Sequence, residues 1–392
     1  MRREIHMEDK LIIEKLELFK VPPRWLFLKI TTKEGIVGWG EPIVEGRADT
    51  VAACVDELAQ YVIGQSAHRI QDLWQVLYRG GFYRGGPILM SAISGIDQAL
   101  WDIKGKSVGL PVYQLLGGAV RTKMKMYCWI GGDDPEVVIQ QARDRVDEGY
   151  SAVKMNATGP MAWIASQKDI TKVVENIRLL REEFGDDLDI GLDFHGRVHK
   201  GMVRPLIDQL RPFHPMFIEE PVLSEHAEAL HHISAYSGIP IATGERMYSR
   251  WDFKQLLHDG HVSIIQPDLS HAGGISEVFR IAAMAEAYDV AVAPHCPLGP
   301  ISLAAALQLD FACINAAIQE SSIGIHYNQG FDLLDYVANP EIFAVTDGYI
   351  QLFQKPGLGV EIDEAAVKRA QQLGHQWTNP IWRLPDGSVA EW

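Results

Sequence analysis

Acidic and imidazole side chains recur at the ends of short apolar runs in the second half of the chain. Six of them follow one another at intervals of 23 to 27 residues: Asp193, Glu219, Glu245, Asp268, His295 and Glu320. His195 stands two residues after the first of them. An interval of this size accommodates one strand, one helix and their turns, so successive parallel strands are predicted to carry these groups at their C-terminal ends.

Three of these acids, Asp193, Glu219 and Glu245, would lie on neighbouring strands. Carboxylates a few ångströms apart do not all stay ionised unless a cation compensates them. A hard divalent ion does so, and an all-oxygen ligand set favours Mg2+ or Mn2+ over zinc. A single strand-end acid could instead cap a helix N-terminus, but three in register favour a metal. Glu220, next to Glu219, fits either interpretation.

Two histidines, His195 and His295, would face each other across the mouth, with the acids between them. Asp268 ends the strand beside that of His295, where it can accept a ring N–H and fix the tautomer. Two proton-transfer groups around a Lewis acid suit proton abstraction at one carbon and protonation of a leaving group. Glu320 either hydrogen-bonds a developing enolate oxygen or pairs with a Lys or Arg.

The apolar runs that end in these residues alternate with amphipathic stretches from about residue 123 onward. Eight runs with seven or eight intervening helices predict a (β/α)8-type barrel. A doubly wound sheet is the alternative, but it usually has fewer strands and a Gly-rich phosphate turn, and no GxGxxG follows an early strand. The sequence also lacks a GxxxxGK[ST] loop, a GxSxG elbow and an HExxH helix motif.

The two ends of the chain have a different pattern. Residues 10–41 alternate as strands do and residues 48–116 have a helical period, which predicts an α+β module. We expect an α+β cap over 1–123, a barrel over 124–345, and a Trp-rich segment over 346–392 that returns to the cap. Met7 is a second candidate start, which would make residues 1–6 an extension.

Composition limits the partners and the compartment. The 392 residues include 36 Lys and Arg against 51 Asp and Glu, a formal net charge of −15. This excess of acidic residues argues against binding to nucleic acid or to anionic membrane surfaces, because both attract clustered Lys and Arg. The four cysteines form no CxxC pair, no apolar stretch is long enough to span a bilayer, and no signal peptide opens the chain. We therefore expect a soluble cytoplasmic protein with a small-molecule substrate.

Five motifs hold the ionisable residues: GLDFH (191–195), FIEEP (217–221), TGER (243–246), QPD (266–268) and APH (293–295). With them, the chain resembles the enolase superfamily essentially end to end, in the branch similar to mandelate racemase. The resemblance implies Asp193, Glu219 and Glu245 as ligands of one Mg2+ per subunit. It implies a (β/α)7β TIM-like barrel under an α+β capping domain built from the N-terminal part and the C-terminal tail. It also suggests a homo-oligomer.

The resemblance also implies a reaction class. Racemases of this branch carry Lys-x-Lys at the end of the second barrel strand, where this chain has Lys154, Met155 and Asn156. With the second Lys missing and His195 on the third strand, the resemblance favours Mg-dependent dehydration of an aldonic acid, with D-galactonate as the expected substrate. His295 would then remove the C2 proton, and His195 would protonate the departing 3-hydroxyl.

Three alternatives remain at this level. They are a dehydratase of another acid sugar such as gluconate, an acid-sugar epimerase with two opposed histidine bases, and an inactive binding barrel. Cap loops near Trp25, Glu45, Arg47 and Tyr83 are expected to choose the sugar. The segment 157–168 is expected to border the site.

Overall fold

The computed structural model describes residues 10–131 and 135–391. The suggested extension over residues 1–6 lies outside this range. The described chain begins with a three-stranded antiparallel sheet in which the middle strand pairs with both others. Its strands are β1 (Ile13–Val21), β2 (Trp25–Thr32) and β3 (Val37–Gly40). This meander follows the predicted alternation of apolar residues over 10–41.

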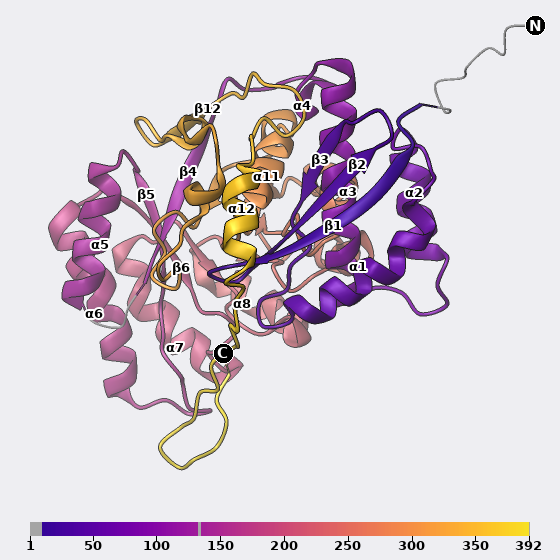
Figure 1. Cartoon of the computed structure of the whole chain (residues 1–392). Coiled ribbons are helices and arrows are strands. Elements are labelled where there is room, and N and C mark those ends of the chain that lie inside the picture. Colours follow the sequence, from indigo (N-terminus) through magenta and orange to yellow (C-terminus); the bar gives the residue numbers. More distant parts are fainter. Residues whose placement is uncertain (1–9, 132–134, 392) are drawn as a thin grey trace, which may run out of the picture.

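The helices that follow this sheet are α1 (Ala48–Val62), α2 (Ile70–Arg79), α3 (Pro87–Val108) and α4 (Val112–Leu115). Of these, α1 and α3 pack on the strands, and α2 and α4 pack against α3 (Figure 1). The longest, α3, begins with a proline in its first turn and ends at Gly109, which adopts a left-handed conformation with φ 70°. It packs directly on β3, because a Cβ at Gly40 would lie only 1.9 Å from the carbonyl oxygen of Gly95.

Eight parallel strands follow within the described residues, in the order β10-β9-β8-β7-β6-β5-β4-β11. They are β4 (Lys123–Ile130), β5 (Ala152–Asn156), β6 (Asp189–Asp193), β7 (Phe217–Glu219), β8 (Ile241–Thr243), β9 (Ile264–Ile265), β10 (Ala291–Val292) and β11 (Gln319–Ser321). A parallel bridge between Val292 and Ala316 joins β10 to the residues just before β11. The curled sheet confirms the barrel prediction, and the doubly wound alternative is wrong.

One helix connects each pair of consecutive barrel strands. The helices are α5 (Pro135–Asp147), α6 (Gln167–Phe184), α7 (Lys200–Leu210), α8 (Leu230–Ser237), α9 (Arg250–Asp259), α10 (Gly274–Glu286) and α11 (Pro300–Ala312). Seven helices between eight strands give the (β/α)7β arrangement expected from the family resemblance. Their apolar faces pack on the strands, so the C-terminal ends of all eight strands open toward one mouth.

The C-terminal segment returns to the N-terminal sheet, as expected. Strand β12 (Tyr349–Gln351) first pairs antiparallel with the start of β4. Helix α12 (Glu364–Gln371) then lies against β1 (Figure 1). An ion pair of 2.8 Å between Lys29 and Glu364 links the helix to β2. The domain limits set at residues 123 and 345 remain a sequence prediction.

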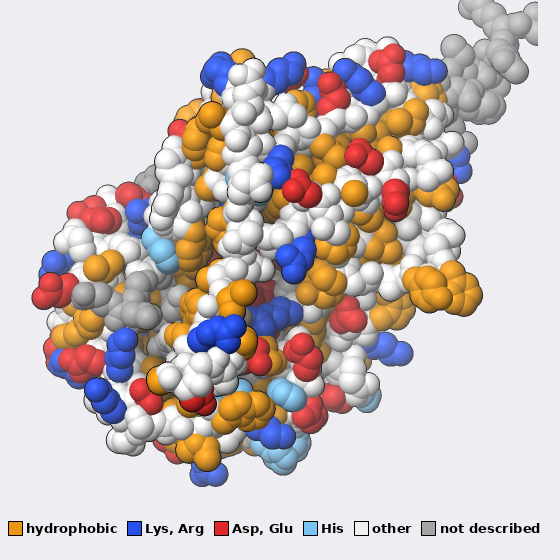
Figure 2. All heavy atoms as spheres, turned by 60° about the horizontal axis from the view of Figure 1, so that its bottom comes forward, with side chains coloured by type: hydrophobic (Ala, Val, Ile, Leu, Met, Phe, Trp, Pro, Cys, Tyr) orange, Lys and Arg blue, Asp and Glu red, His pale blue; other side chains and the backbone are white. Residues whose placement is uncertain are grey.

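The outer surface carries charges of both signs. Figure 2 shows acidic and basic side chains interspersed over the face that it presents. Among the described residues, no helix combines the length and the apolar character needed to cross a membrane.

Candidate active site

The predicted site residues meet at the mouth of the barrel. Asp193 and Glu219 are the last residues of β6 and β7, and they are direct partners in the parallel register of these strands. Glu245, Asp268 and His295 follow the ends of β8, β9 and β10 by two or three residues. Glu320 lies within β11. The strand ends and the turns after them thus bring together the six acidic and imidazole groups that recur along the barrel half of the sequence.

A cavity of about 390 Å³ lies over these strand ends. His195, Glu245, His295 and Glu320 line it directly. Three other acids lie behind this lining with no exposed surface: Asp193, Glu219 and Asp268. The chemistry-bearing residues therefore form two layers, one in contact with the cavity and one that supports it.

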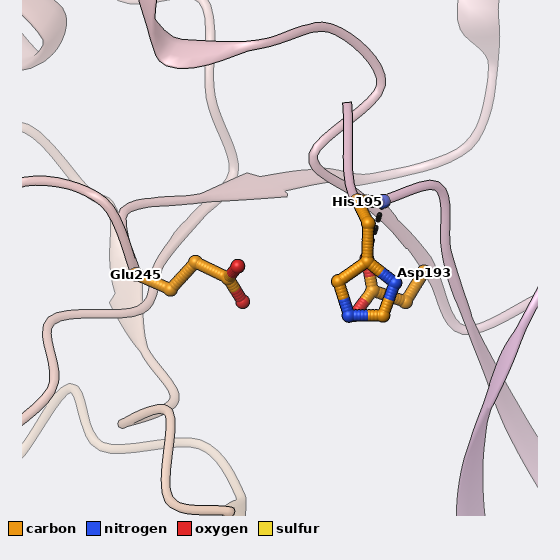
Figure 3. A group of neighbouring side chains, drawn as sticks. All are labelled: Asp193, His195 and Glu245. Atoms are coloured by element: carbon orange, nitrogen blue, oxygen red, sulfur yellow. Dashed lines mark hydrogen bonds and ion pairs between the residues drawn. The ribbon is translucent and has the colours of Figure 1, made fainter. Parts of the chain in front are cut away.

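The geometry of the acids fits a divalent cation. Asp193, His195 and Glu245 each offer a ligand atom, and these atoms all lie within 4.8 Å of one another. Figure 3 shows Glu245, which follows β8, extended toward Asp193 and His195 at the end of β6. Asp193 Oδ2 and Glu245 Oε2 are buried and accept no hydrogen bond in the described part of the chain. Buried carboxylate oxygens of this kind require a compensating charge, which a hard cation supplies.

Lys154 supplies part of the compensating charge. Its buried ammonium lies 2.7 Å from Glu219 Oε1, 2.9 Å from Glu320 Oε1 and 3.6 Å from Asp193 Oδ2. Burial alone would lower the pKa of Lys154, but the surrounding carboxylates raise it well above its usual value. The sequence interpretation noted Lys154 only as half of an incomplete Lys-x-Lys pair. It lies in β5, the second barrel strand, where a lone Lys carries no spacing signal for this role.

Glu219 is held by two donors. Lys154 binds one of its oxygens, and the amide of Gln266 donates to the other at 2.6 Å. Burial and the neighbouring Asp193 raise the pKa of Glu219 well above its usual value. The side chain is therefore costly to ionise unless a further positive charge is present.

Asp193 fixes His195. The backbone N–H of His195 donates to Asp193 Oδ1 at 2.7 Å, and the ring Nε2 lies 2.9 Å from Oδ2. His195 has a left-handed backbone with φ 48°, which turns the chain sharply after β6. The ring of Trp129 packs edge-on against it at 5.5 Å. Burial opposes ionisation of Asp193, but His195 and Lys154 outweigh it and lower its pKa.

Asp268 fixes His295 in a second pair. Its Oδ2 lies 2.8 Å from Nδ1 of His295, and its Oδ1 accepts from the backbone N–H of Ser270 at 2.6 Å. This contact directs the other ring nitrogen, Nε2, toward Glu245, 3.4 Å away. Burial opposes protonation of His295, but Glu245 and Asp268 raise its pKa to about 10. A cation bound to Glu245 would offset the negative charge of this carboxylate, and the pKa of His295 would then be raised less.

Glu220 points away from the cavity-lining acids. The hydroxyl of Thr243 and the backbone N–H of Gly244 donate to its Oε1, and Arg246 lies 3.9 Å from its Oε2. Burial and the charge of Glu245 raise its pKa to about 7. Glu220, which the sequence left ambiguous, thus supports the turn that carries Glu245.

The side of the cavity opposite the barrel comes from the cap and the C-terminal tail. The lining includes Glu45 and, from the cap loop expected near Trp25, Arg24. Trp25 has no exposed surface, because its ring packs edge-on against Tyr336 at 5.8 Å. Two more of the expected selectors, Arg47 and Tyr83, do not line the cavity.

Residues 157–161, from the segment expected to border the site, help line a separate pocket of about 150 Å³. That segment ends in a capping box between Ser166 and Asp169 that starts α6.

Comparison with known proteins fits this architecture. A profile of the mandelate racemase / muconate lactonizing enzyme N-terminal domain matches residues 22–117, and an enolase C-terminal domain-like profile matches residues 137–366. The chain belongs to the enolase superfamily. The two profiles together cover most of the described cap and barrel.

Several relatives with assigned activities are similar over their whole length. D-galactonate dehydratase of Pectobacterium atrosepticum is 59% identical over 380 residues, which is 97% of this chain and 100% of the relative. The protein of the same name from Klebsiella pneumoniae is 57% identical with the same coverage. Among solved structures, an enolase from Agrobacterium radiobacter bound to Na and L-malate superimposes with a TM-score of 0.89. It is 31% identical and covers 97% of this chain and 100% of its own.

Proposed function

We propose that the chain is a hydro-lyase that converts D-galactonate to 2-dehydro-3-deoxy-D-galactonate and water. The observation that carries the proposal is a pair of histidines in one cavity, each held by its own buried carboxylate, around a cluster of acids that the single Lys154 compensates only in part. The relatives named D-galactonate dehydratase, at 57–59% identity over full length, support the substrate.

The carboxylates bind the cofactor in this proposal. Asp193, Glu219 and Glu245 would hold one Mg2+, whose charge offsets the negative charge that develops beside the substrate carboxylate. Lys154, which lines the cavity, lies within 3.6 Å of two of these acids and also binds Glu320, so it holds the acids together. Glu320 also accepts from the backbone N–H of Cys296 at 2.7 Å, which fixes its position beside the reacting carbons.

His295 acts as the base. Asp268 accepts a hydrogen bond from Nδ1–H, which leaves Nε2 to face the cavity as the atom that takes the C2 proton. The C2–H bond breaks, and its electron pair moves toward C1 and forms an enediolate. Glu320 lies in the same lining and contacts the oxygen side of this intermediate.

His195 acts as the acid. When the C3–O bond breaks, the ring of His195 gives its proton to the departing hydroxide, and water leaves. The resulting enol tautomerises to the 2-keto-3-deoxy acid. A positioned acid or base of this kind typically contributes ~10²–10⁴ in rate.

The test is formation of a 2-keto acid from D-galactonate with Mg2+, compared with an EDTA-treated sample. We expect metal-dependent product. If only another aldonate, such as gluconate, yields product, the reaction class stands and the substrate assignment falls. If C2 inverts without loss of water, the protein is an epimerase. If no aldonate is converted at all, the protein is an inactive binding barrel.

We also propose a cytoplasmic homo-oligomer, which the resemblance to its superfamily suggests. Light scattering on the purified protein should give a mass that is a multiple of the single-chain mass. A single-chain mass at micromolar concentration would contradict it.

A further inference from the structure

The last residues of the chain form an irregular tail after α12. A bridge between Arg383 and Val389 closes a small loop in it, at the bottom of Figure 1 and in the forward part of Figure 2. Leu373, Ile381 and Val389 of this segment are 65–74% exposed. The tail therefore buries little apolar surface of its own, and its position must depend on other contacts.

Two arginines beside the active site hold the tail. The guanidinium of Arg24 lies between two aromatic rings, 5.4 Å from Tyr327 and 5.8 Å from Trp377. The guanidinium of Arg197 lies 4.3 Å from the ring of Trp382. Both arginine side chains are almost fully buried, so these cation–π contacts are formed away from bulk water, where they are strongest.

Arg24 is itself fixed from the cap and the barrel. It forms an ion pair of 2.6 Å with Glu45 and donates to the backbone carbonyl of Pro297 at 2.6 Å. Trp377 covers the guanidinium on one side. The tail thereby completes a cluster of polar contacts around Arg24, and this cluster joins residues that are more than 270 positions apart in the chain.

Two tail residues reach the catalytic cavity. Trp377 and Asn379 line the same cavity as His195 and His295. Asn379 also lies against the cap loop, because a Cβ placed on Gly46 would come within 3.2 Å of its side-chain amide. Asn379 is exposed at the cavity, so its amide donor and acceptor are open to a ligand.

We propose that Trp377 and Asn379 are specificity-determining residues for the part of the acid sugar beyond the reacting carbons. The inference rests on the proposed function, in which the barrel acids and histidines bind C1 to C3. The hydroxyls on C5 and C6 then extend toward the cap and the tail. Asn379 supplies a donor and an acceptor to them, and Trp377 holds Arg24 and Glu45 in place beside them.

The experiment compares Asn379→Ala with Gln376→Ala in the full-length enzyme with Mg2+. Gln376 is an exposed amide on the same tail that lines neither this cavity nor the neighbouring pocket. For D-galactonate we expect the KM of Asn379→Ala to rise about tenfold, with kcat within about threefold of wild type, as for loss of one hydrogen bond to a substrate hydroxyl. Gln376→Ala should match wild type.

A four-carbon aldonate with the same configuration at C2 and C3 serves as a second probe. Its inhibition constant against D-galactonate turnover should be the same for wild type and Asn379→Ala, because it lacks the hydroxyls on C5 and C6. Equal KM values for Asn379→Ala and Gln376→Ala, or an equal loss for the short acid, would overturn the inference. Absence of wild-type turnover would instead overturn the proposed function.

Trp377→Ala extends the test to Arg24. Its KM should rise at least as much as that of Asn379→Ala, since Arg24 loses one of its two covering rings. An unchanged KM in a variant with wild-type circular dichroism and melting temperature would exclude Trp377 from the substrate subsite.

Discussion

The two sides of the cavity are built differently. On the barrel side, Asp193, Glu219 and Lys154 are at most 1% exposed and belong to parallel strands. On the side of the cap and tail, Glu45 is 19% exposed and Asn379 lies in an irregular segment. Side chains on the barrel strands are held by the hydrogen bonds between the strands and by one another. Side chains of the cap and tail depend on contacts between separate segments of the chain.

This difference separates chemistry from recognition. The buried charges of the barrel must keep one geometry, because an uncompensated charge there is costly. A contact on the side of the cap and tail can be changed without leaving a buried charge of the barrel uncompensated. Substitutions in the barrel should therefore lower kcat, and substitutions in the cap and tail should raise KM.

The largest effect is expected for His295→Asn. Loss of the base should reduce both dehydration and exchange of the C2 proton in D2O by ~10³ or more, at the upper part of the usual range for such groups. The measurements are 2-keto acid formation and the C2 signal by NMR. His258→Asn, on the exposed face of α9, is the control. A His295→Asn enzyme that exchanges C2 at the wild-type rate would show that another group is the base.

His195→Asn should affect dehydration much more than exchange of the C2 proton. Dehydration should fall by ~10²–10⁴, because the leaving hydroxide is no longer protonated, while C2 exchange should stay within about tenfold of wild type. The same two assays apply, with Mg2+ affinity measured alongside to exclude damage to Asp193. Equal losses in both reactions would contradict the separate role of His195 as the acid.

Mg2+ should stabilise the folded protein through the barrel acids. At a concentration 100 times its Kd, a ligand specific for the native state adds about 2.7 kcal/mol to the free energy of unfolding. Urea titrations with and without Mg2+ measure this difference. Glu245→Gln should lose most of it, and Glu225→Gln, an exposed acid outside the cavity lining, should retain it. Identical shifts for both variants would place the ion elsewhere.

The smallest effect is expected on the cap side. Glu45→Gln weakens the ion pair with Arg24, so the KM for D-galactonate should rise by about tenfold, equivalent to about 1.4 kcal/mol, with little change in kcat. Steady-state kinetics with D-galactonate measure both constants. Asp49→Asn, which removes the exposed partner of Lys20 on the same cap, should change neither constant. A fall in kcat for Glu45→Gln would remove the distinction between the two sides.

The barrel half of the site could be predicted because its signals are local. The alternation of strand and helix patterns fixes where each strand ends, and the steps of 23 to 27 residues place one ionisable group at each end. Parallel strands then bring these groups to one mouth whatever the details of packing. Lys154 was the exception, because its partners lie on β7 and β11 and a lone Lys carries no spacing signal.

The cap half could not be predicted in the same way. Arg24 and Trp25 are neighbours, and consecutive residues at a strand start point to opposite sides. Which of them faces the cavity depends on how the small sheet packs on the barrel, and a difference of one residue reverses the answer. The sequence analysis named only the cap loop near Trp25, and the structure shows that Arg24 of this loop lines the cavity while Trp25 itself is buried.

The sequence by itself determined the barrel, the family and the acids and histidines at its strand ends, since strand and helix periodicity and residue spacing are properties of short segments. Only the tertiary structure decided that Arg24, Glu45, Trp377 and Asn379 meet across the cavity. These residues come from two cap loops and a tail more than 300 positions away. Their meeting depends on the docking of preformed units, which no local pattern encodes.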